Sequence, residues 1–488
     1  MADKKIPRCM STQHPDNVNL PFFAQSTVLG GEDEIQEAYY ALSHLCCDEQ
    51  MWDCEGKEVD DFVVKKLLTK YEPFFRDNRL GEDVFITLRV PNPSIEKPEA
   101  KILLETLESI PRSYDVAKLF YGDGIPPIFE VILPMTASAK SIDRIYHYYS
   151  DYVAGKKNKP VMEGDITIAE WIGDFSPDKV NVIPLFEDME HMLAADAITK
   201  AYIKDKDLSS QRVFLARSDP AMNYGLISAV LLNKIALRRL YLLAEETGVD
   251  LYPIIGVGSA PFRGDLRPDT VNKVLKEYPS AHTFTIQSAL KYDNPPEKVR
   301  ETIAKLRERK TKEPHAVDEE KCIELLNRYL REYQKQITAL APLINKVARY
   351  VPERRKRKLH VGLFGYSRSM GDVKLPRVIT FTCALYSVGL PPEILGLNSL
   401  SESDIGLVRE SYINFDQCLA GALSYYNPDT KYMPKELKAT IKKLGIDYET
   451  DREHKRITDQ VIRSIENNQT EGRNELILRA ASIRKFLG

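Results

Sequence analysis

The chain has 488 residues, with 68 Lys and Arg against 71 Asp and Glu, so its net charge is near −3. This balance leaves no basic surplus for binding nucleic acid or an anionic membrane surface. No apolar run approaches the roughly 20 residues that cross a bilayer, and the first residues contain no apolar signal core. The seven cysteines form no CxxC pair, which is typical of reduced thiols. We therefore expect a soluble cytoplasmic protein with neither a nucleic-acid nor a membrane partner.

Eight runs rich in β-branched and aromatic residues, most of them separated by helical stretches, are candidate strands. They are Glu49–Cys54 (the weakest), Val84–Val90, Ile128–Pro134, Val182–Glu187, Val213–Ser218, Tyr252–Gly256, His282–Gln287 and Leu359–Tyr366. Two of the helical stretches have the residues that favour helix ends: Asp188–Lys204 starts with acidic residues, and Pro220–Thr247 lies between a proline and Gly248. Eight alternating units predict an α/β fold of the closed (β/α)8 TIM-barrel type.

The remaining segments suggest how the chain is divided. Residues 1–30 have no regular period, and we expect them to form an ordered N-terminal arm that contributes the loop around His14. The barrel would occupy residues 31–389, with a charged helical insertion around 295–350. In residues 390–488 turn signals alternate with helices, which predicts a mostly helical C-terminal region packed on the barrel.

Charged and polar residues cluster at the carboxyl ends of the predicted strands, where a barrel carries its active site. They are Arg89, Glu187, Arg217, Asp219, Gln287 and Arg368. Any one of them could be an ordinary polar residue between a strand and a loop, but several at the same end favour a site. Two carboxylates, Glu187 and Asp219, with an arginine beside one of them suit a divalent cation that holds an anionic substrate.

His14 lies in a polar loop constrained by Pro15, and a histidine near its ordinary pKa of about 6.5 can exchange a proton at neutral pH. The alternative is a surface turn closed by Asp16 or Asn17, and the spacing alone favours that turn.

Two loops rich in small residues follow predicted strands, Gly256–Gly264 and Gly362–Gly371. Backbone N–H groups of the first, at Gly258 and Ser259, can approach an oxyanion, and Arg263 can add charge-assisted bonds. Neither loop has a nucleotide-binding spacing. The basic run Arg354–Lys358 is interpreted as a solvated loop. Cys46, Cys47, Cys54 and His44 fit no zinc pattern, which favours buried thiols.

Taken in order, these segments resemble phosphoenolpyruvate carboxylase of the short archaeal type over nearly the whole chain. The segments that carry the resemblance are Ser11–Asn17, Leu88–Pro93, Phe129–Met135, Pro184–Glu187, Val213–Gly225, Gly256–Gly264 and Gly365–Gly371. The resemblance implies that phosphoenolpyruvate and bicarbonate give oxaloacetate and phosphate, through carboxyphosphate and the enolate of pyruvate, for anaplerotic CO₂ fixation. It also implies a homotetramer.

By position, the resemblance implies His14 as catalytic base and Glu187 with Asp219 as ligands of Mg²⁺ or Mn²⁺. It implies substrate-binding roles for Arg89, Arg263 and Arg368. Arg263 matches the last arginine of the family's glycine-rich loop, and we also expect a catalytic role for it, in which it holds the carboxyphosphate and keeps CO₂ from escaping. Against the larger bacterial and plant enzymes, Met222 stands where they have a lysine, and Arg217 replaces their tyrosine. We therefore infer that Arg217 supplies the missing positive charge in catalysis. The segment Trp52–Lys57 is only faintly similar to a loop of those enzymes, so the roles of Asp53 and Lys57 stay open.

The sequence is also compatible with two other functions. The same barrel could catalyse another reaction of phosphoenolpyruvate or pyruvate, although the absence of a nucleotide loop disfavours a kinase. A non-enzymatic helical scaffold for organic acids would bind substrate without turnover, and would leave the strand-end charges without a use.

Overall fold

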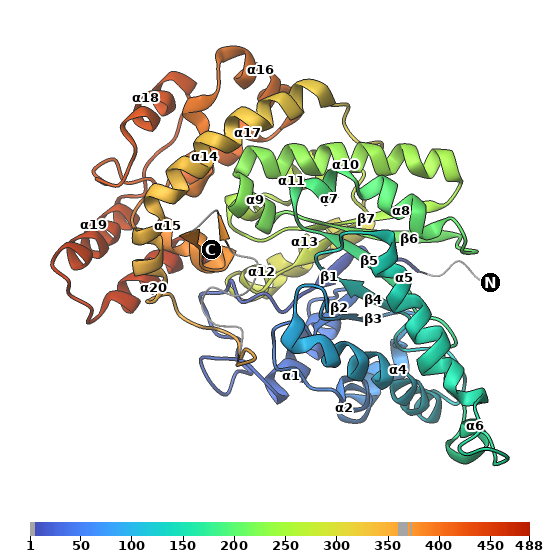
Figure 1. The fold of residues 1–488 in the computed structure, drawn as a ribbon. Coiled ribbons are helices and arrows are strands. Elements are labelled where there is room, and N and C mark those ends of the chain that lie inside the picture. Colours follow the sequence, from blue (N-terminus) through green and yellow to red (C-terminus); the bar gives the residue numbers. More distant parts are fainter. Residues whose placement is uncertain (1–4, 360–368, 371–372) are drawn as a thin grey trace.

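Eight parallel strands close into a barrel in the computed structural model, which describes residues 5–359, 369–370 and 373–488 (Figure 1). Each strand pairs with the next along the chain, and β8 pairs with β1. The strands are β1 (Cys9–Ser11), β2 (Glu49–Asp53), β3 (Phe85–Arg89), β4 (Glu130–Leu133), β5 (Asn181–Phe186), β6 (Ser210–Ala216), β7 (Asp250–Gly256) and β8 (Thr283–Ile286). The predicted (β/α)8 barrel is confirmed, and seven predicted strands match β2 to β8 within three residues.

The eighth strand differs from the prediction. β1 lies in the segment expected to be an ordered arm without a strand, where Met10 pairs with Glu49 of β2 and with Thr285 of β8. Three residues are too few to show a strand period, which explains why the sequence does not reveal β1. The predicted strand Leu359–Tyr366 falls outside the described residues except for Leu359, which lies in a turn.

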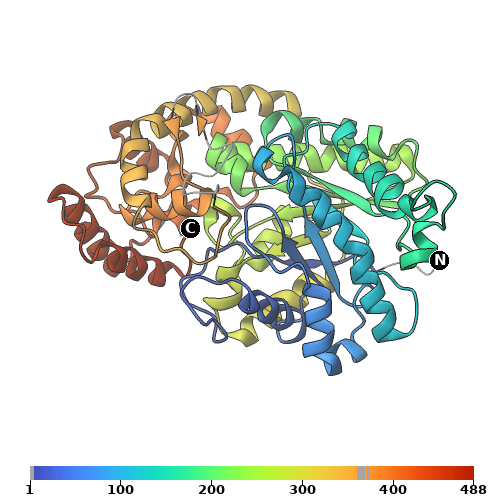
Figure 2. The same ribbon diagram turned by 60° about the horizontal axis from the view of Figure 1, so that its bottom comes forward.

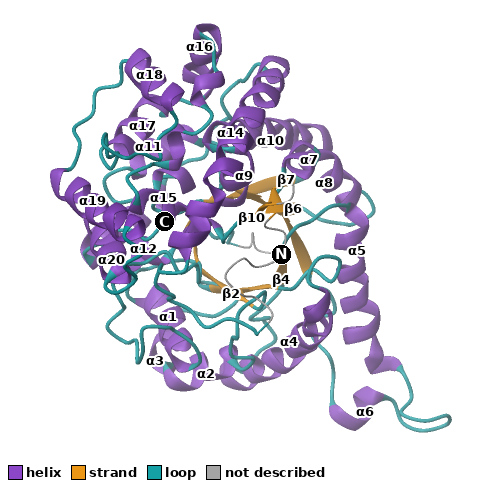
Figure 3. Ribbon diagram, turned by 60° about the vertical axis from the view of Figure 1, so that its left-hand side comes forward, coloured by secondary structure: helices purple, strands orange, loops and turns teal. Residues whose placement is uncertain are grey.

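Helices surround the ring of strands, as Figure 3 shows. In chain order they are α1 (Glu32–Ser43), α2 (Val63–Lys70), α3 (Glu72–Asp77), η1 (Lys97–Glu99), α4 (Ala100–Tyr121), α5 (Ala139–His147), η2 (Tyr148–Ala154), η3 (Gly155–Asn158), α6 (Ile168–Ile172), α7 (Met189–Leu193), α8 (Ala195–Ile203), α9 (Ser218–Tyr224), α10 (Leu226–Thr247), η4 (Pro261–Arg263), α11 (Val271–Glu277), α12 (Ser288–Tyr292) and α13 (Pro296–Glu308). The predicted helix over 220–247 is divided at Gly225, whose φ of 88° suits glycine and would strain other residues.

The second half of the chain adds helices on one side of the barrel, visible in Figures 1 and 2. They are α14 (Glu319–Ala348), α15 (Val378–Ser387), η5 (Pro392–Ile394), η6 (Leu397–Ser399), α16 (Glu402–Ser411), α17 (Phe415–Leu423), α18 (Lys435–Leu444), α19 (Arg452–Glu466) and α20 (Arg473–Arg484), with a small hairpin of β9 (Ser369–Met370) and β10 (Val373–Lys374). Leu215 of β6, Leu326 of α14 and Leu419 of α17 belong to one hydrophobic core, so these helices are packed on the barrel.

The inside of the barrel is a packed core with a buried ion cluster. Met10, Met51, Ile132, Ile183, Leu185, Phe214, Ala216 and Ile254 form the apolar part. Arg212 of β6 donates to both carboxylate oxygens of Glu49, at 2.8 and 2.7 Å, and to Glu130 at 3.2 Å. These contacts offset the charge of the buried guanidinium, and together with the apolar side chains they fill the inside of the barrel.

Among the described residues no single helix is long and apolar enough to span a membrane. One bent pair, α15 with Pro392–Ser399, reaches the required length and composition with a bend of 96°. α15 is buried in the core along its whole length except at Thr380.

Candidate active site

A cavity of about 890 Å³ lies beyond the carboxyl ends of the barrel strands. Four residues predicted from the sequence line it together: His14, Arg89, Glu187 and Asp219. Arg89 is the last residue of β3, and the other three follow β1, β5 and β6, so four strands bring them to one face of the barrel. Its volume lies within the range of about 300–1,000 Å³ that is typical of small-molecule sites.

His14 is partly buried, and its Nδ1 lies 2.9 Å from Thr12 Oγ1. Burial, together with the positive charges of Lys57, Arg89, Arg263 and Arg357, holds the pKa of the imidazole well below 6.5. The surface turn that the spacing favours is therefore wrong. The ring is neutral at physiological pH, which is the form that a general base needs.

The two predicted metal ligands follow neighbouring strands of the barrel. Glu187 directly follows β5, and its Oε2 accepts a hydrogen bond of 2.8 Å from the backbone N–H of Met135. Asp219 is in the first turn of α9, after β6. Within the described ranges no group of three or more His, Cys, Asp or Glu could hold a metal. Two carboxylates that leave the other positions to water and substrate suit Mg²⁺, so the donor set fits a divalent cation.

Asp53, whose role the sequence left open, orients Arg89, which lines the cavity. Asp53 is fully buried and accepts bonds from Arg89 Nε at 2.7 Å and Arg89 Nη2 at 3.1 Å. Arg89 also pairs with Glu55 at 2.8 Å. Lys57 pairs with Asp53 and lines the cavity, and burial, followed by the positive charges of Arg89, Arg357 and Arg355, lowers its pKa well below 10.5.

The basic run Arg354–Lys358 is part of the cavity wall, and its interpretation as a solvated loop is wrong. Arg355 is 3% exposed and pairs with Glu34 at 2.9 Å and Glu37 at 2.7 Å. Arg354 is also buried and donates to the backbone carbonyls of residues 17 and 18. A charge run in one sequence does not reveal buried acidic partners that lie more than 300 residues away.

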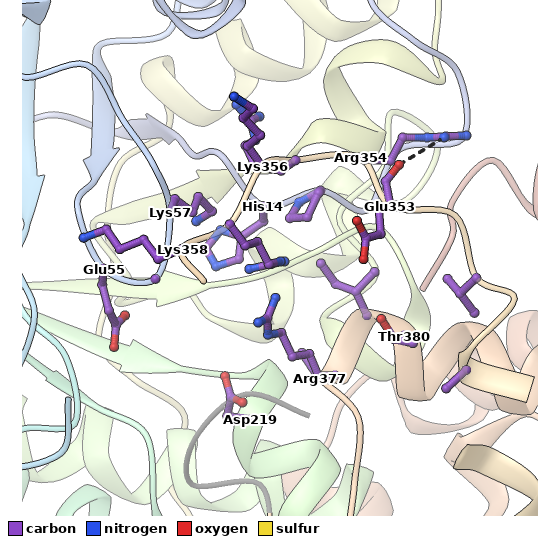
Figure 4. Close-up of a pocket in the computed structure, with 18 of the residues that line it drawn as sticks. His14, Glu55, Lys57, Asp219, Glu353, Arg354, Lys356, Lys358, Arg377 and Thr380 are labelled. Carbon is purple, nitrogen blue, oxygen red and sulfur yellow. Dashed lines mark hydrogen bonds between the residues drawn. The ribbon is translucent and has the colours of Figure 1, made fainter. Parts of the chain in front are cut away.

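Two further cations of the wall are Arg357 and Arg377. Burial and the like charges of Arg355 and Arg89 lower the pKa of Arg357 to about 10. Arg377 precedes α15, and in the view of Figure 4 it lies between His14 and Asp219. The sequence analysis proposes neither as a site residue, although Arg377 directly precedes a helix and follows the second of the two loops rich in small residues, 362–371.

Arg263 does not line the cavity. It is fully buried and donates to Asp16 Oδ2 at 3.1 Å, to Ser218 Oγ at 3.2 Å and to the carbonyl of Gly488 at 2.6 Å. Because Asp16 is two residues from His14, these contacts fix the His14 loop. In this structure Arg263 is therefore placed to hold the His14 loop.

The glycine-rich loop closes on itself beneath Arg263. The backbone N–H of Gly258 donates to the Arg263 carbonyl at 2.8 Å, and Ser259 Oγ donates to the Leu266 carbonyl at 3.3 Å. Neither residue lines the cavity. The described contacts thus give Gly258 and Ser259 a role in the shape of the loop and bring neither to a substrate.

Arg217, expected to replace the missing lysine, also points elsewhere. It is 1% exposed, donates to the Phe262 carbonyl at 3.2 Å, and lines a small separate cavity with Tyr278 and Tyr412. Met222 is buried in the core. Among the described residues, Lys57, Arg357 and Arg377 are better placed than Arg217 to supply positive charge. Arg368 lies outside the described residues.

A parallel barrel that presents a histidine, two carboxylates and several cations at its carboxyl-end mouth defines a barrel enzyme built for a small anionic substrate. A family model described as phosphoenolpyruvate carboxylase matches residues 6–488. Curated relatives with that name are 59% identical over 484 residues in Methanothermobacter thermautotrophicus and in Methanospirillum hungatei, and 52% identical over 486 residues in Pyrococcus furiosus. Each match covers 99% of this chain and 100% of the relative. The chain therefore belongs to the phosphoenolpyruvate carboxylase family, which are carboxy-lyases.

Proposed function

We propose that this chain joins phosphoenolpyruvate and bicarbonate to give oxaloacetate and inorganic phosphate. The observation that carries the proposal is the meeting of His14, Arg89, Glu187 and Asp219 in one cavity at the carboxyl ends of the strands. The family match over nearly the whole chain supports the same reaction.

Charge is the first obstacle to this reaction, because both substrates are anions. Two like unit charges 4 Å apart repel each other by about 4 kcal/mol at an effective dielectric constant of about 20. Lys57, Arg89, Arg357 and Arg377 line the cavity and would offset this repulsion. Arg89 is held by Asp53 and Glu55 and would bind a phosphate or carboxylate in a fixed orientation.

Glu187 and Asp219 would hold the divalent cation. When bound, Mg²⁺ or Mn²⁺ supplies a Lewis acid that withdraws charge from the phosphoryl oxygens and the substrate carboxylate. The hydrogen bond from the Met135 N–H fixes one oxygen of Glu187, so its carboxylate is orientated before a ligand arrives.

The chemistry begins when a bicarbonate oxygen attacks phosphorus and the bond from phosphorus to the enol oxygen breaks. The products are carboxyphosphate and the enolate of pyruvate. His14, neutral because of its lowered pKa, then accepts the carboxyphosphate proton. The bond between carbon and the phosphate oxygen breaks, releasing CO₂ and phosphate, and the enolate carbon attacks CO₂ to form oxaloacetate. The walls of the cavity would keep CO₂ close to the enolate.

Arg263 acts indirectly in this proposal, by holding other residues in place. Its bonds to Asp16 and Ser218 hold the His14 loop against the start of α9, the helix that carries Asp219. The base and the carboxylates would therefore keep their relative positions during the two steps. Arg217 would shape the same region through the Phe262 carbonyl without touching substrate.

The test is phosphoenolpyruvate turnover with Mg²⁺, with and without added bicarbonate. Phosphate is measured directly, and oxaloacetate is trapped with malate dehydrogenase and NADH. Equal, bicarbonate-dependent yields of the two products would support the carboxylase. Phosphate without oxaloacetate would contradict it, and so would the absence of turnover.

A further inference from the structure

A projecting segment between η3 and β5 stands away from the body of the molecule (Figures 1 and 3). We call residues 158–179, which include α6, the finger. None of its residues is buried. Five large apolar side chains on it are 38–67% exposed: Val161, Met162, Ile166, Trp171 and Ile172. Trp171 is one of two tryptophans in the chain, and the other, Trp52, is 1% exposed.

The finger is nevertheless well folded. Two backbone hydrogen bonds of 2.9 Å join the two sides of the turn before α6. One runs from the N–H of Val161 to the carbonyl of Ile166, and the other from the N–H of Ile168 to the carbonyl of Lys159. Thr167 and Glu170 form a capping box at the start of α6. The apolar side chains are thus held in a defined arrangement that they do not bury within their own chain, which is typical of a surface that meets a partner.

An apolar groove lies on the other side of α4 from the base of the finger. It is a surface cavity of about 540 Å³ between α2 and α4, and its apolar lining is Phe62, Leu68, Val116, Leu119 and Phe120. Leu119 is 88% exposed. Exposed apolar side chains are concentrated in this part of the molecule: of the fourteen large ones on the described residues, eight belong to α4, η2 or the finger, and a ninth, Phe62, directly precedes α2.

The two features are complementary in charge. The finger contains five acidic and two basic residues. The groove carries Lys65, Arg76 and Arg112 against Asp61 and Glu72, and Arg112 and Arg76 lie over the rings of Phe62 and Phe120. An acidic segment with an apolar tip therefore fits a groove with an apolar floor and a basic excess.

The position of α4 suggests how two copies meet. Glu108 of α4 pairs with Lys156 at the base of the finger at 3.7 Å, whereas Arg112, Val116 and Leu119 of the same helix face the groove. Because finger and groove flank one helix, a two-fold axis over α4 would bring each finger to the groove of the other copy.

We propose that the finger of one copy seats Trp171 and Ile172 in the α2–α4 groove of a second copy, and that the exchange is reciprocal. This interface lies apart from the active-site cavity and does not depend on the proposed reaction.

The first experiment measures the molar mass of the purified full chain by light scattering after size-exclusion chromatography. Trp171→Asp and Leu119→Asp, one on each side of the proposed contact, should each at least halve the mass. Leu242→Asp is the matched control, since Leu242 is a 51% exposed leucine on α10, outside both features. Wild-type protein that is monomeric at micromolar concentrations would overturn the proposal. An unchanged mass for Leu119→Asp would overturn the groove as the docking site.

A second experiment tests the contact itself and does not depend on the stability of one variant. Ile172→Cys and Leu119→Cys are made in separate chains, mixed, dissociated and reassembled, then treated with a short bismaleimide. A cross-linked dimer that forms in the mixture but in neither single variant is expected. Equal cross-linking in either variant alone, or none in the mixture, would contradict the finger-to-groove contact.

Discussion

At the scale of single residues, His14 controls which products leave the enzyme in the proposed mechanism. Asparagine keeps a polar side chain of similar size but cannot accept a proton. In His14→Asn we expect bicarbonate-dependent phosphate release to continue, while oxaloacetate formation falls by a factor of about 10² to 10⁴ and pyruvate appears instead. The two products are measured in the same sample. A full yield of oxaloacetate would remove His14 from the mechanism.

The lowered pKa of His14 can be tested by titration. Burial and the surrounding cations favour the neutral ring, so the folded protein binds this proton less tightly than the unfolded chain does. We expect the NMR signal of the His14 ring, identified by its loss in His14→Asn, to change little between pH 8 and about 6.5. A ring with the ordinary pKa would be half protonated at the lower limit. A midpoint at or above about 6.5 would contradict the proposed environment.

The two carboxylates are expected to set the metal requirement. Replacement of residues that merely support a metal ligand weakens affinity by roughly 10- to 100-fold, so Glu187→Ala or Asp219→Ala should raise the half-saturating concentration of Mn²⁺ by at least that much. Activation by Mn²⁺ is measured at saturating phosphoenolpyruvate. Glu190→Gln, which changes an exposed carboxylate three residues from Glu187, is the control and should leave the titration unchanged. Unchanged activation in both alanine variants would show that the metal lies elsewhere.

The sequence predicts the position of a site residue when that residue directly follows a clearly apolar strand. It does not predict the position when contacts with residues far away in the chain determine where the side chain lies. Glu187 and Asp219 come directly after apolar runs, so barrel geometry alone brings them to one cavity. Arg263 also follows a predicted strand, but its bonds to Asp16 and Gly488 keep it out of the cavity lining, and no local pattern reveals those contacts. The sequence does not assign a role to Lys57, because its segment is only faintly similar to a loop of the larger enzymes, whereas the structure places Lys57 in the cavity wall.

At the scale of elements, the segment over 350–358 is fixed to the barrel by buried charge. Arg355 pairs with Glu34 and Glu37 of α1, and all three side chains are at most 1% exposed. Arg355→Met leaves these carboxylates buried without their main counter-charge, which should reduce the free energy of unfolding by about 3 to 5 kcal/mol. Urea denaturation measures the change, and Lys356→Met, at the exposed neighbour, is the control.

The loss of stability in Arg355→Met is expected to depend on pH, and the pKa of Glu34 gives the direction of this dependence. Burial raises the pKa of Glu34 to about 7 even with Arg355 present, so the folded state holds this proton more tightly than the unfolded chain, whose value is near 4.5. The contribution of Glu34 is therefore favourable at low pH and is lost as pH rises through about 7. Without Arg355 the buried Glu34 carboxylate loses its counter-charge, so its ionisation at high pH costs more folding free energy. The decrease in the free energy of unfolding caused by Arg355→Met should therefore be greater at pH 8 than at pH 5. A larger effect at pH 5 would contradict this account.

Elements were predictable where the chain has enough residues to show a period. β2 to β8 have four to seven residues each, and the alternation of strands and helices revealed the barrel. β1 has three residues, and its position is fixed by pairing with two distant strands. The sequence did not predict the exposed apolar surface of the finger either, because an exposed tryptophan can be told from a buried one only when the fold is known.

At the scale of the whole molecule, the last residues of the chain lie against the loop that carries His14. The N–H of Leu487 donates to the Asp16 carbonyl at 2.7 Å, and the Gly488 carbonyl accepts from Arg263. Phe486 and Leu487 are fully buried. The helices α15 to α20 thus bring residues from the end of the chain to the loop that carries His14, so residues outside the barrel also support the proposed base.

Deletion of Leu487 and Gly488 should therefore reduce activity more than stability. Two hydrogen bonds to the His14 loop and its anchor are lost, and displacement of a catalytic group by about 1 Å can reduce turnover on the order of 100-fold. We expect kcat for oxaloacetate to fall by about that factor while the thermal unfolding temperature changes by a few degrees. Ser482→Ala, at an exposed position of α20, is the control and should leave both unchanged. If the deletion lowers stability and activity in parallel, the last residues serve the core. Unchanged kcat would mean that Asp16 and Arg263 hold the His14 loop without them.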